Sequence, residues 1–328
     1  MILERGILQM NKKGNGGVSK ILSQFAILIA LIILLIFFSV TTDGFLSTTN
    51  IFNIMRQVAV NGIAAVGMTM VIITGGIDIS VGSMMGVASV CCATLMVRGM
   101  HPVLAVLLVL ILGLAVGTAH GCFVYDIGLP PMIATLATMS ILRGVTYIIS
   151  GGLPVYGFPE GFNVIGQGYI GPVPVPVIIM VICFVIGWFI LERTSFGRYV
   201  YGVGSNKEAS RLSGVNVRKV IYGVYGLCGM LAAMSGVVLL SRVNSGQPKA
   251  GESYEMDIIT AVVLGGVSTN GGEGRIGNVI IGLLLMGVLL NGMVMMNIPD
   301  YYQRVVKGFV LLLAISYDKL SQKRANKK

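Results

Sequence analysis

The sequence has little charge. Among its 328 residues only 11% are charged and only 13 are acidic, whereas 55% are hydrophobic, and the mean hydropathy is +0.87. Soluble domains carry about 25% charged and about 45–50% apolar residues. The low charge excludes a water-soluble globule of this size, and the many apolar residues exclude an intrinsically disordered chain.

Residues that build metal, disulfide and nucleophilic sites are also scarce. The two histidines, His101 and His120, are too few and too far apart for a metal site, and no CxxC motif occurs. The cysteines lie inside apolar runs, where we expect them to act as small packing residues: Cys91, Cys92, Cys122, Cys183 and Cys228. A membrane enzyme would need clustered histidine, cysteine or carboxylate side chains, so we expect no catalytic residue and no metal site.

The G-x-x-x-x-G-K-[ST] motif, whose backbone amides cradle nucleotide phosphates, is absent as well. Gly202 and Gly204 form too short a motif and follow no strand of a βαβ unit. We therefore expect this chain to bind no cofactor, so any energy from ATP must come from another subunit.

The sequence does contain long apolar runs rich in glycine, which accounts for 45 residues. A transmembrane helix needs about 20 apolar residues, and glycine lets such helices approach closely. The runs predict an all-α polytopic membrane protein with about ten transmembrane helices in one domain over residues 21–318. The predicted helices cover 21–41, 52–74, 80–97, 102–125, 131–150, 173–191, 219–241, 255–272, 277–296 and 303–318.

Basic residues are distributed unevenly. Sixteen of the 23 lie in segments 1–20, 192–219 and 319–328 or at Arg275, which share one side of the membrane if ten helices alternate in direction. Because basic residues concentrate in cytoplasmic segments, both termini are predicted to be cytoplasmic tails, over 1–20 and 319–328. The net charge of +10 is explained by this asymmetry, and we expect no nucleic-acid partner.

Residues 151–172 form a long connection on the predicted external side. The segment is rich in glycine and proline, which favours a folded-back loop over a helix. Its aromatic residues are expected to rest on the membrane interface: Tyr156, Phe158, Phe162 and Tyr169.

The longest connection, residues 192–219, is predicted to be cytoplasmic, and its centre has the pattern of a short capped helix. Ser205 or Asn206 can cap the start. Glu208 falls in the first turn, where the helix dipole favours an anion, and Gly214 can stop the helix.

Leu212 and Arg211 in this segment would offer an apolar anchor and a charge to a partner. Composition alone leaves two interpretations open. The segment is either a docking element for another protein or an ordinary solvated loop that carries cytoplasmic charge.

Asp78 lies between two apolar runs. An ionised aspartate at mid-bilayer costs about 2.5–3.5 kcal/mol, so this side chain must face a partner, a water-filled cavity or the interface. The preceding Gly75 and Gly76 weaken a helix. Two roles stay open: a pathway-lining or gating hinge, or a helix cap in which Asp78 or Ser80 starts the third predicted helix.

Several motifs, in order along the chain, resemble one family. Glu208-Ala209-Ser210-x-x-x-Gly214 resembles the EAA-x-x-x-G coupling loop of permease subunits in ABC importers, although Ser210 replaces the second alanine and no Leu-Pro follows Gly214. The wider segments that look like the branch serving ribose, galactose, arabinose, xylose and similar sugars are 192–217, 75–82, 254–272, 291–292 and 307–308. The resemblance covers about residues 50–318.

The resemblance implies a subunit that moves a small sugar into the cell across a bacterial plasma (inner) membrane. It implies a second permease copy or paralogue, a cytoplasmic ATPase that binds ATP and magnesium, an external sugar-binding protein and surrounding lipid. The residues that it assigns to coupling with the ATPase are Glu208, Ala209, Ser210, Arg211, Leu212, Ser213 and Gly214.

Few other polar residues lie in the predicted helices. Gln57 and Asn61 share one helix face, and Asn291 lies late in the ninth helix. With Asp78 they are candidates for a substrate pathway, since sugar hydroxyls need donors and acceptors. For Gln57, Asn61 and Asn291 we favour a role in tying helices together. The alternative function, an ion-coupled secondary transporter of a small polar solute, would need an ion site near the midplane, for which Asp78 is the one candidate.

Overall fold

The computed structural model describes residues 27–325, which form a bundle of helices. Six helices in this part of the chain are long and apolar enough to cross a membrane: α2 (Thr48–Ile73), α4 (Pro102–Tyr125), α5 (Pro131–Ser150), α7 (Val175–Arg193), α10 (Val217–Val243) and α12 (Ile276–Met295). Shorter apolar helices cover Ile27–Thr41 and α3 (Val81–Val97), and α13 (Asp300–Ala325) closes the described chain. The predicted all-α polytopic membrane architecture is confirmed.

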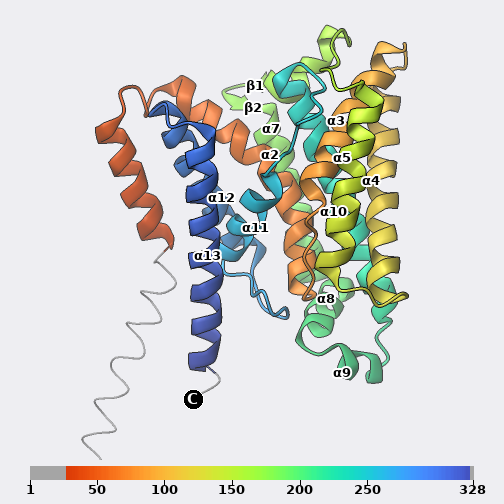
Figure 1. Ribbon diagram of the computed structural model, residues 1–328. Coiled ribbons are helices and arrows are strands. Elements are labelled where there is room, and N and C mark those ends of the chain that lie inside the picture. Colours follow the sequence, from red (N-terminus) through yellow and green to blue (C-terminus); the bar gives the residue numbers. More distant parts are fainter. Residues whose placement is uncertain (1–26, 326–328) are drawn as a thin grey trace, which may run out of the picture.

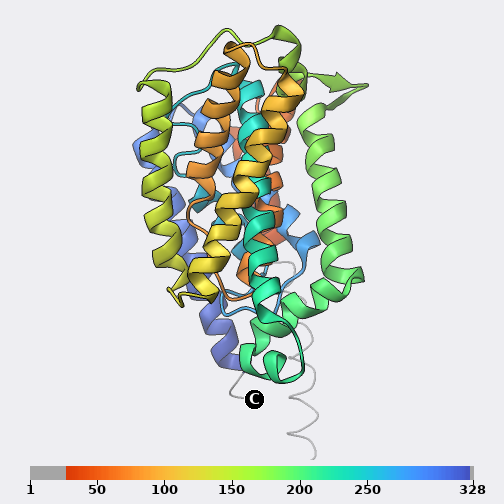
Figure 2. The ribbon, with the colours of Figure 1, turned by 90° about the vertical axis from the view of Figure 1, so that its right-hand side faces the viewer.

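The bundle has two distinct ends (Figures 1 and 2). One end carries α8 (Ser195–Ser205) and α9 (Lys207–Leu212) and is called the α9 end; the C-terminal end of α13 lies there too. The opposite end carries the antiparallel strands β1 (Tyr169–Ile170) and β2 (Val173–Pro174) and is called the hairpin end. The long helices run along the axis that joins the two ends.

Helix α10 lies at the centre and packs against α2, α3 and, most extensively, α4. Glycines allow the close approach to α4. A β-carbon on Gly117 would collide with the Tyr225 carbonyl oxygen, and one on Gly113 would collide with that of Gly229. This small-residue packing is the usual way in which membrane helices gain contact, since lipid supplies no hydrophobic drive between them.

The predicted continuous helix over 255–272 is wrong. The structure has α11 (Tyr254–Leu264), which is 11 residues long, about 16 Å at 1.5 Å per residue and too short for a hydrocarbon core of about 30 Å. The helix ends at Gly265, and Gly266 adopts a φ of +80°. The non-helical segment 244–253 precedes α11, just as the non-helical segment 74–80 precedes α3.

The connection over 151–172 folds back as predicted, but its aromatic residues divide into two groups. The segment forms the short helices η1 (Glu160–Asn163) and α6 (Val164–Gln167) before the hairpin. Phe158 and Phe162 are buried and pack edge to face at 5.6 Å, so the expected interfacial position is wrong for these two. Tyr156 and Tyr169 are exposed.

The predicted N-terminal tail over 1–20, and the start of the first predicted helix, lie outside the described residues. At the other end α13 continues beyond the expected boundary at 318 as far as Ala325.

Candidate functional site

Helix α9 has the capped start that the sequence predicts. Asn206, rather than Ser205, is the capping residue, and its Oδ1 accepts a hydrogen bond of 2.9 Å from the Ala209 backbone nitrogen. Glu208 lies in the first turn and forms a 2.8 Å ion pair with Arg211. Both side chains are largely exposed, and exposed pairs contribute little to stability. The pair is therefore accessible to a partner.

The end of α9 is equally well defined. Gly214 adopts a φ of +84°. Its nitrogen donates to the Arg211 carbonyl at 3.1 Å, and the Val215 nitrogen donates to the Ser210 carbonyl at 3.1 Å. These two bonds form a Schellman motif, which satisfies the last carbonyls of the helix. The predicted glycine stop is confirmed.

Helix α9 projects from the bundle (Figure 1). Ser210 is buried, but Ala209 and Ser213 are exposed, and Leu212 is 84% exposed. A leucine so exposed on a polar segment is a candidate anchor for another protein.

Two sets of contacts tie α9 and the start of α10 to the end of α4. The Lys207 ammonium lies 5.0 Å from the centre of the Tyr125 ring. Asp126, which follows α4, accepts hydrogen bonds from Tyr222 and, at 2.9 Å, from Arg218. The Tyr222 hydrogen bond and then the Arg218 cation hold the pKa of the Asp126 carboxyl below its ordinary value.

Four glycines join the end of α8 to segment 74–80 and to the turn after α11 (265–275), at a contact that we call the glycine junction: Gly75, Gly204, Gly271 and Gly272. The Gly272 nitrogen donates to the Ile73 carbonyl at 2.8 Å. A β-carbon on Gly271 would lie 2.9 Å from the Gly75 nitrogen and 3.0 Å from the Gly204 oxygen. The end of α2, the end of α8 and the turn after α11 therefore touch backbone to backbone.

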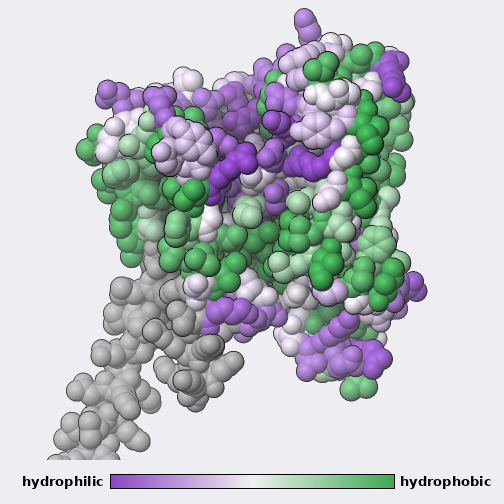
Figure 3. Space-filling model, viewed as in Figure 1, coloured by the Kyte–Doolittle hydropathy of each residue, from purple (hydrophilic) through white to green (hydrophobic). Residues whose placement is uncertain are grey.

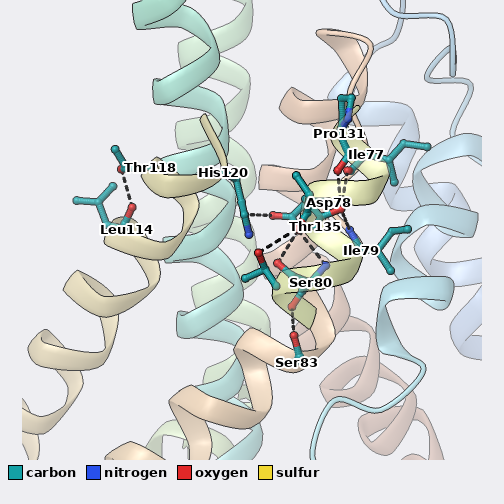
Figure 4. A network of polar contacts seen from close by, with 12 residues as sticks. Ile77, Asp78, Ile79, Ser80, Ser83, Leu114, Thr118, His120, Pro131 and Thr135 are labelled. Carbon is teal, nitrogen blue, oxygen red and sulfur yellow. Dashed lines mark hydrogen bonds and ion pairs between the residues drawn. The ribbon is translucent and has the colours of Figure 1, made fainter. Parts of the chain in front are cut away.

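Asp78 is buried beside a partner that the sequence did not reveal (Figure 4). Its Oδ1 accepts hydrogen bonds from the Ser80 nitrogen at 2.9 Å and from the Ser80 hydroxyl at 2.6 Å, directly before α3. Its Oδ2 lies 3.5 Å from Nδ1 of His120 on α4, and both side chains are 1% exposed. The contacts to Ser80 organise the start of α3, while a role in the substrate pathway stays a prediction.

The other predicted pathway residues are spread along α2 and α12. Asn291 exchanges two amide hydrogen bonds of 2.9 Å with Asn50, which joins α12 to α2. Asn61 is buried further along α2, and Gln57 is half-buried. The structure thus brings Asn291 to a helix–helix contact and does not gather the four candidates in one site.

A polar groove between α11, α13 and α5 was missed by the sequence analysis. Asp257 forms a 2.9 Å ion pair with Lys307, Arg304 bridges Glu252 and Asp300, and Arg143 donates to the Ala250 carbonyl at 2.8 Å. Figure 3 shows hydrophilic residues gathered in the hollowed part of this face towards the hairpin end. Glu255 and Asp257 had appeared in one family motif, but Lys307, the partner of Asp257, lies 50 positions away in the sequence.

Comparisons with known proteins agree with this architecture. Residues 50–315 match the model of the family described as the permease component of branched-chain amino acid transport systems. The ribose import permease RbsC of Bacillus subtilis is 44% identical over 293 residues, covering 89% of this chain and 91% of the relative. No solved structure matches.

Two relatives from Escherichia coli K12 extend the comparison. The ribose import permease RbsC is 44% identical, covering 90% of this chain and 93% of the relative. The xylose transport permease XylH is 34% identical, and the matched region covers 93% of this chain and 93% of the relative. These relatives are transport subunits of the bacterial inner membrane and not enzymes. With its family match over most of its length, the chain belongs to the family of ABC-importer permease components.

Proposed function

We propose that this chain is the permease subunit of an ATP-driven importer that carries a small sugar into the cell. The names of the similar ribose and xylose permeases support a small sugar as the substrate. A separate ATPase binds ATP and magnesium, and an external binding protein delivers the sugar. The observation that carries the proposal is α9, a rigidly capped helix that projects from the bundle with Leu212 exposed.

The proposed orientation places the α9 end and both termini in the cytoplasm. The basic residues of 192–219 support this direction under the positive-inside rule. The chain then crosses ten times, because segment 244–253 and α11 together make the eighth crossing between α10 and α12.

A second permease copy, or a paralogue, is proposed to cover the polar groove. Charged side chains and irregular backbone at membrane depth are tolerated only inside protein or beside water, so this face is unsuited to lipid. Elsewhere α4 and α7 expose apolar side chains that suit lipid: Leu104, Leu107, Leu108, Ile111, Val181, Ile182, Val185 and Ile186. The covered groove would then form a water-filled route between the two subunits.

Coupling is proposed to run from α9 through the glycine junction. Leu212 anchors α9 in a groove of the ATPase, and Glu208 and Arg211 fix its register. Movement of α9 reaches α8, to which Asn206 alone links it, and then segments 74–80 and 265–275. Segment 74–80 leads into α3 and segment 265–275 follows α11, so a small displacement of either segment changes the groove.

Two substitutions test the coupling role. Gly214→Val strains a left-handed position by about 1–2 kcal/mol and disrupts the helix stop, and Glu208→Arg replaces the first-turn anion with a cation. Both variants should insert normally, bind the ATPase less well and lose sugar uptake. The measurement is pull-down of the ATPase together with ribose and xylose uptake, in membranes of matched permease content.

Gly161→Val is the matched control, because Gly161 lies near the hairpin end, has no atom within 4 Å of a built β-carbon and needs no positive φ. It should leave ATPase binding unchanged. Normal ATPase binding and parental uptake in both α9 variants would contradict the proposal. Uptake driven by a proton gradient without the ATPase would instead support an ion-coupled transporter.

A further inference from the structure

A cavity of about 170 Å³ lies beside the polar groove, between the hairpin-end half of α10, the middle of α3 and the segment that leads to α11. Its lining combines hydroxyl, amide, charged and apolar groups: Ser89, Leu239, Val243, Ser245, Gln247, Lys249, Ala250, Gly251, Glu252 and Tyr254. None of these residues was singled out as a site by the sequence.

The buried part of the cavity contains a hydroxyl that lacks a partner. Ser89 on α3 is 0% exposed, and its Oγ has no hydrogen-bond partner within the part of the chain that the structure describes. Ser245 is also buried, and its Oγ accepts a 3.2 Å hydrogen bond from Gln247. A buried hydroxyl without a partner is unfavourable, so the cavity is prepared for a ligand that exchanges hydrogen bonds with it.

The outer part of the cavity is charged and accessible. Lys249 and Glu252 are exposed, one a donor and one an acceptor, while Leu239 and Val243 add an apolar surface. Binding sites for small molecules typically combine apolar walls with a few placed polar groups. This combination suits a ring with hydroxyls around its edge and C–H groups on its faces.

The size of the cavity limits the ligand. An apolar cavity of about 150 Å³ holds one benzene ring, so 170 Å³ has room for one small sugar ring. The wall is also held in place, because the Gly246 backbone exchanges two 2.9 Å hydrogen bonds with Val155 and the Ala250 carbonyl accepts one from Arg143. A wall fixed at both ends keeps its polar groups in register for a ligand.

We propose that this cavity is a holding site for a single small sugar ring on the permease itself, occupied after the sugar leaves the external binding protein. The inference rests on the proposed function, and it adds that the permease recognises the sugar directly. Ser89, Ser245 and Gln247 bind hydroxyls of the ring, and Lys249 and Glu252 receive it at the cavity mouth.

The first test is protection of an introduced thiol. Purified permease carrying Gln247→Cys is treated with a methanethiosulfonate reagent, with and without ribose or xylose. At a sugar concentration of about twice the dissociation constant, labelling should slow about threefold, because occupied sites do not react and the rate falls by the factor 1 + [L]/Kd. Gly161→Cys, exposed outside the cavity, should label at the same rate in both conditions, and the parent chain gives the background of its native cysteines.

The second test changes the cavity volume in the complete importer. Ser89→Leu fills the cavity and should abolish uptake while ATPase pull-down persists. Ser89→Ala keeps the cavity open and should raise the KM for sugar with kcat retained. Two outcomes overturn the holding site alone. One is a Ser89→Leu variant that takes up sugar at the parental rate, and the other is a parent importer whose transported sugars do not protect the introduced thiol. Absence of sugar uptake by the parent importer overturns the proposed function and this inference with it.

Discussion

At the scale of single residues, two buried carboxylates each have a partner close by. Asp78 has three such contacts, two from Ser80 and one with His120. Asp257 has Lys307 at 2.9 Å. Since an unpaired buried charge is far more costly than a paired one, these carboxylates help to fix where α3 and α11 begin.

Substitution of Asp78 separates its local hydrogen bonds from its charge. Asp78→Asn keeps an oxygen for Ser80, and asparagine caps helices nearly as well as aspartate, so uptake should stay near the parental rate. Asp78→Ala leaves the Ser80 nitrogen and hydroxyl without this acceptor and should destabilise the permease by about 1–3 kcal/mol. Thermal unfolding of purified permease and uptake at matched abundance measure the two effects. A stable, abundant Asp78→Asn variant without transport would instead assign the charge to the pathway or a gate.

Sequence reasoning succeeded at this scale wherever the interaction is local. The Asn206 cap and the Gly214 stop act within one turn of their own helix, so a few neighbouring residues suffice to predict them. The Asn50–Asn291 and Asp257–Lys307 pairs join residues 241 and 50 positions apart. Only the packing of whole helices brings such partners together.

At the scale of elements, the start of α3 packs against segment 244–253 and the start of α11. Gly82 in the first turn of α3 packs directly on Gly251 and on the carboxylate of Glu255 in the first turn of α11. The sequence predicted a complete helix over 255–272 because hydropathy reports how apolar a segment is and not where a helix in it ends. The Gly265-Gly266 pair ends α11 after 11 residues, and that glycine pair was the signal available in the sequence.

The glycine junction provides a prediction at this scale. A β-carbon on Gly272 would collide with the Ser205 hydroxyl and lie 2.9 Å from the Ser205 nitrogen. Gly272→Ala should therefore push the end of α8 away from the turn after α11. Since α9 itself is unchanged, ATPase binding should persist while sugar uptake falls several-fold. Pull-down and uptake in the same membranes measure the two quantities.

Gly266→Ala is the control for this prediction. Gly266 has a φ of +80°, close to the +77° of Gly272, but no atom lies within 4 Å of a built β-carbon. It carries the same backbone strain, about 1–2 kcal/mol, without the collision. Equal uptake in the two alanine variants would show that contact across the junction does not transmit motion.

At the scale of the whole molecule, polar and apolar surfaces divide along the bundle axis and around it. Hydrophilic residues gather at the α9 end and in the groove towards the hairpin end, with hydrophobic residues over the middle of the visible face (Figure 3). The sequence predicted the first division from its basic residues. It missed the groove, because the groove's residues come from α5, segment 244–253, α11 and α13, which are far apart in the sequence.

Topology is the property of the whole molecule that three single cysteines can test. Gly161, Lys207 and Glu273 are exposed in the connection before α7, in α9 and in the turn after α11. If segment 244–253 and α11 together complete a crossing, a membrane-impermeant maleimide should label Gly161→Cys from outside intact cells. Lys207→Cys and Glu273→Cys should label only after the membrane is opened. The native cysteines are buried or half-buried, so the parent chain should give low background. Labelling of Glu273→Cys from outside would mean that α11 returns to the side from which it came, and the ten-crossing arrangement would then be wrong.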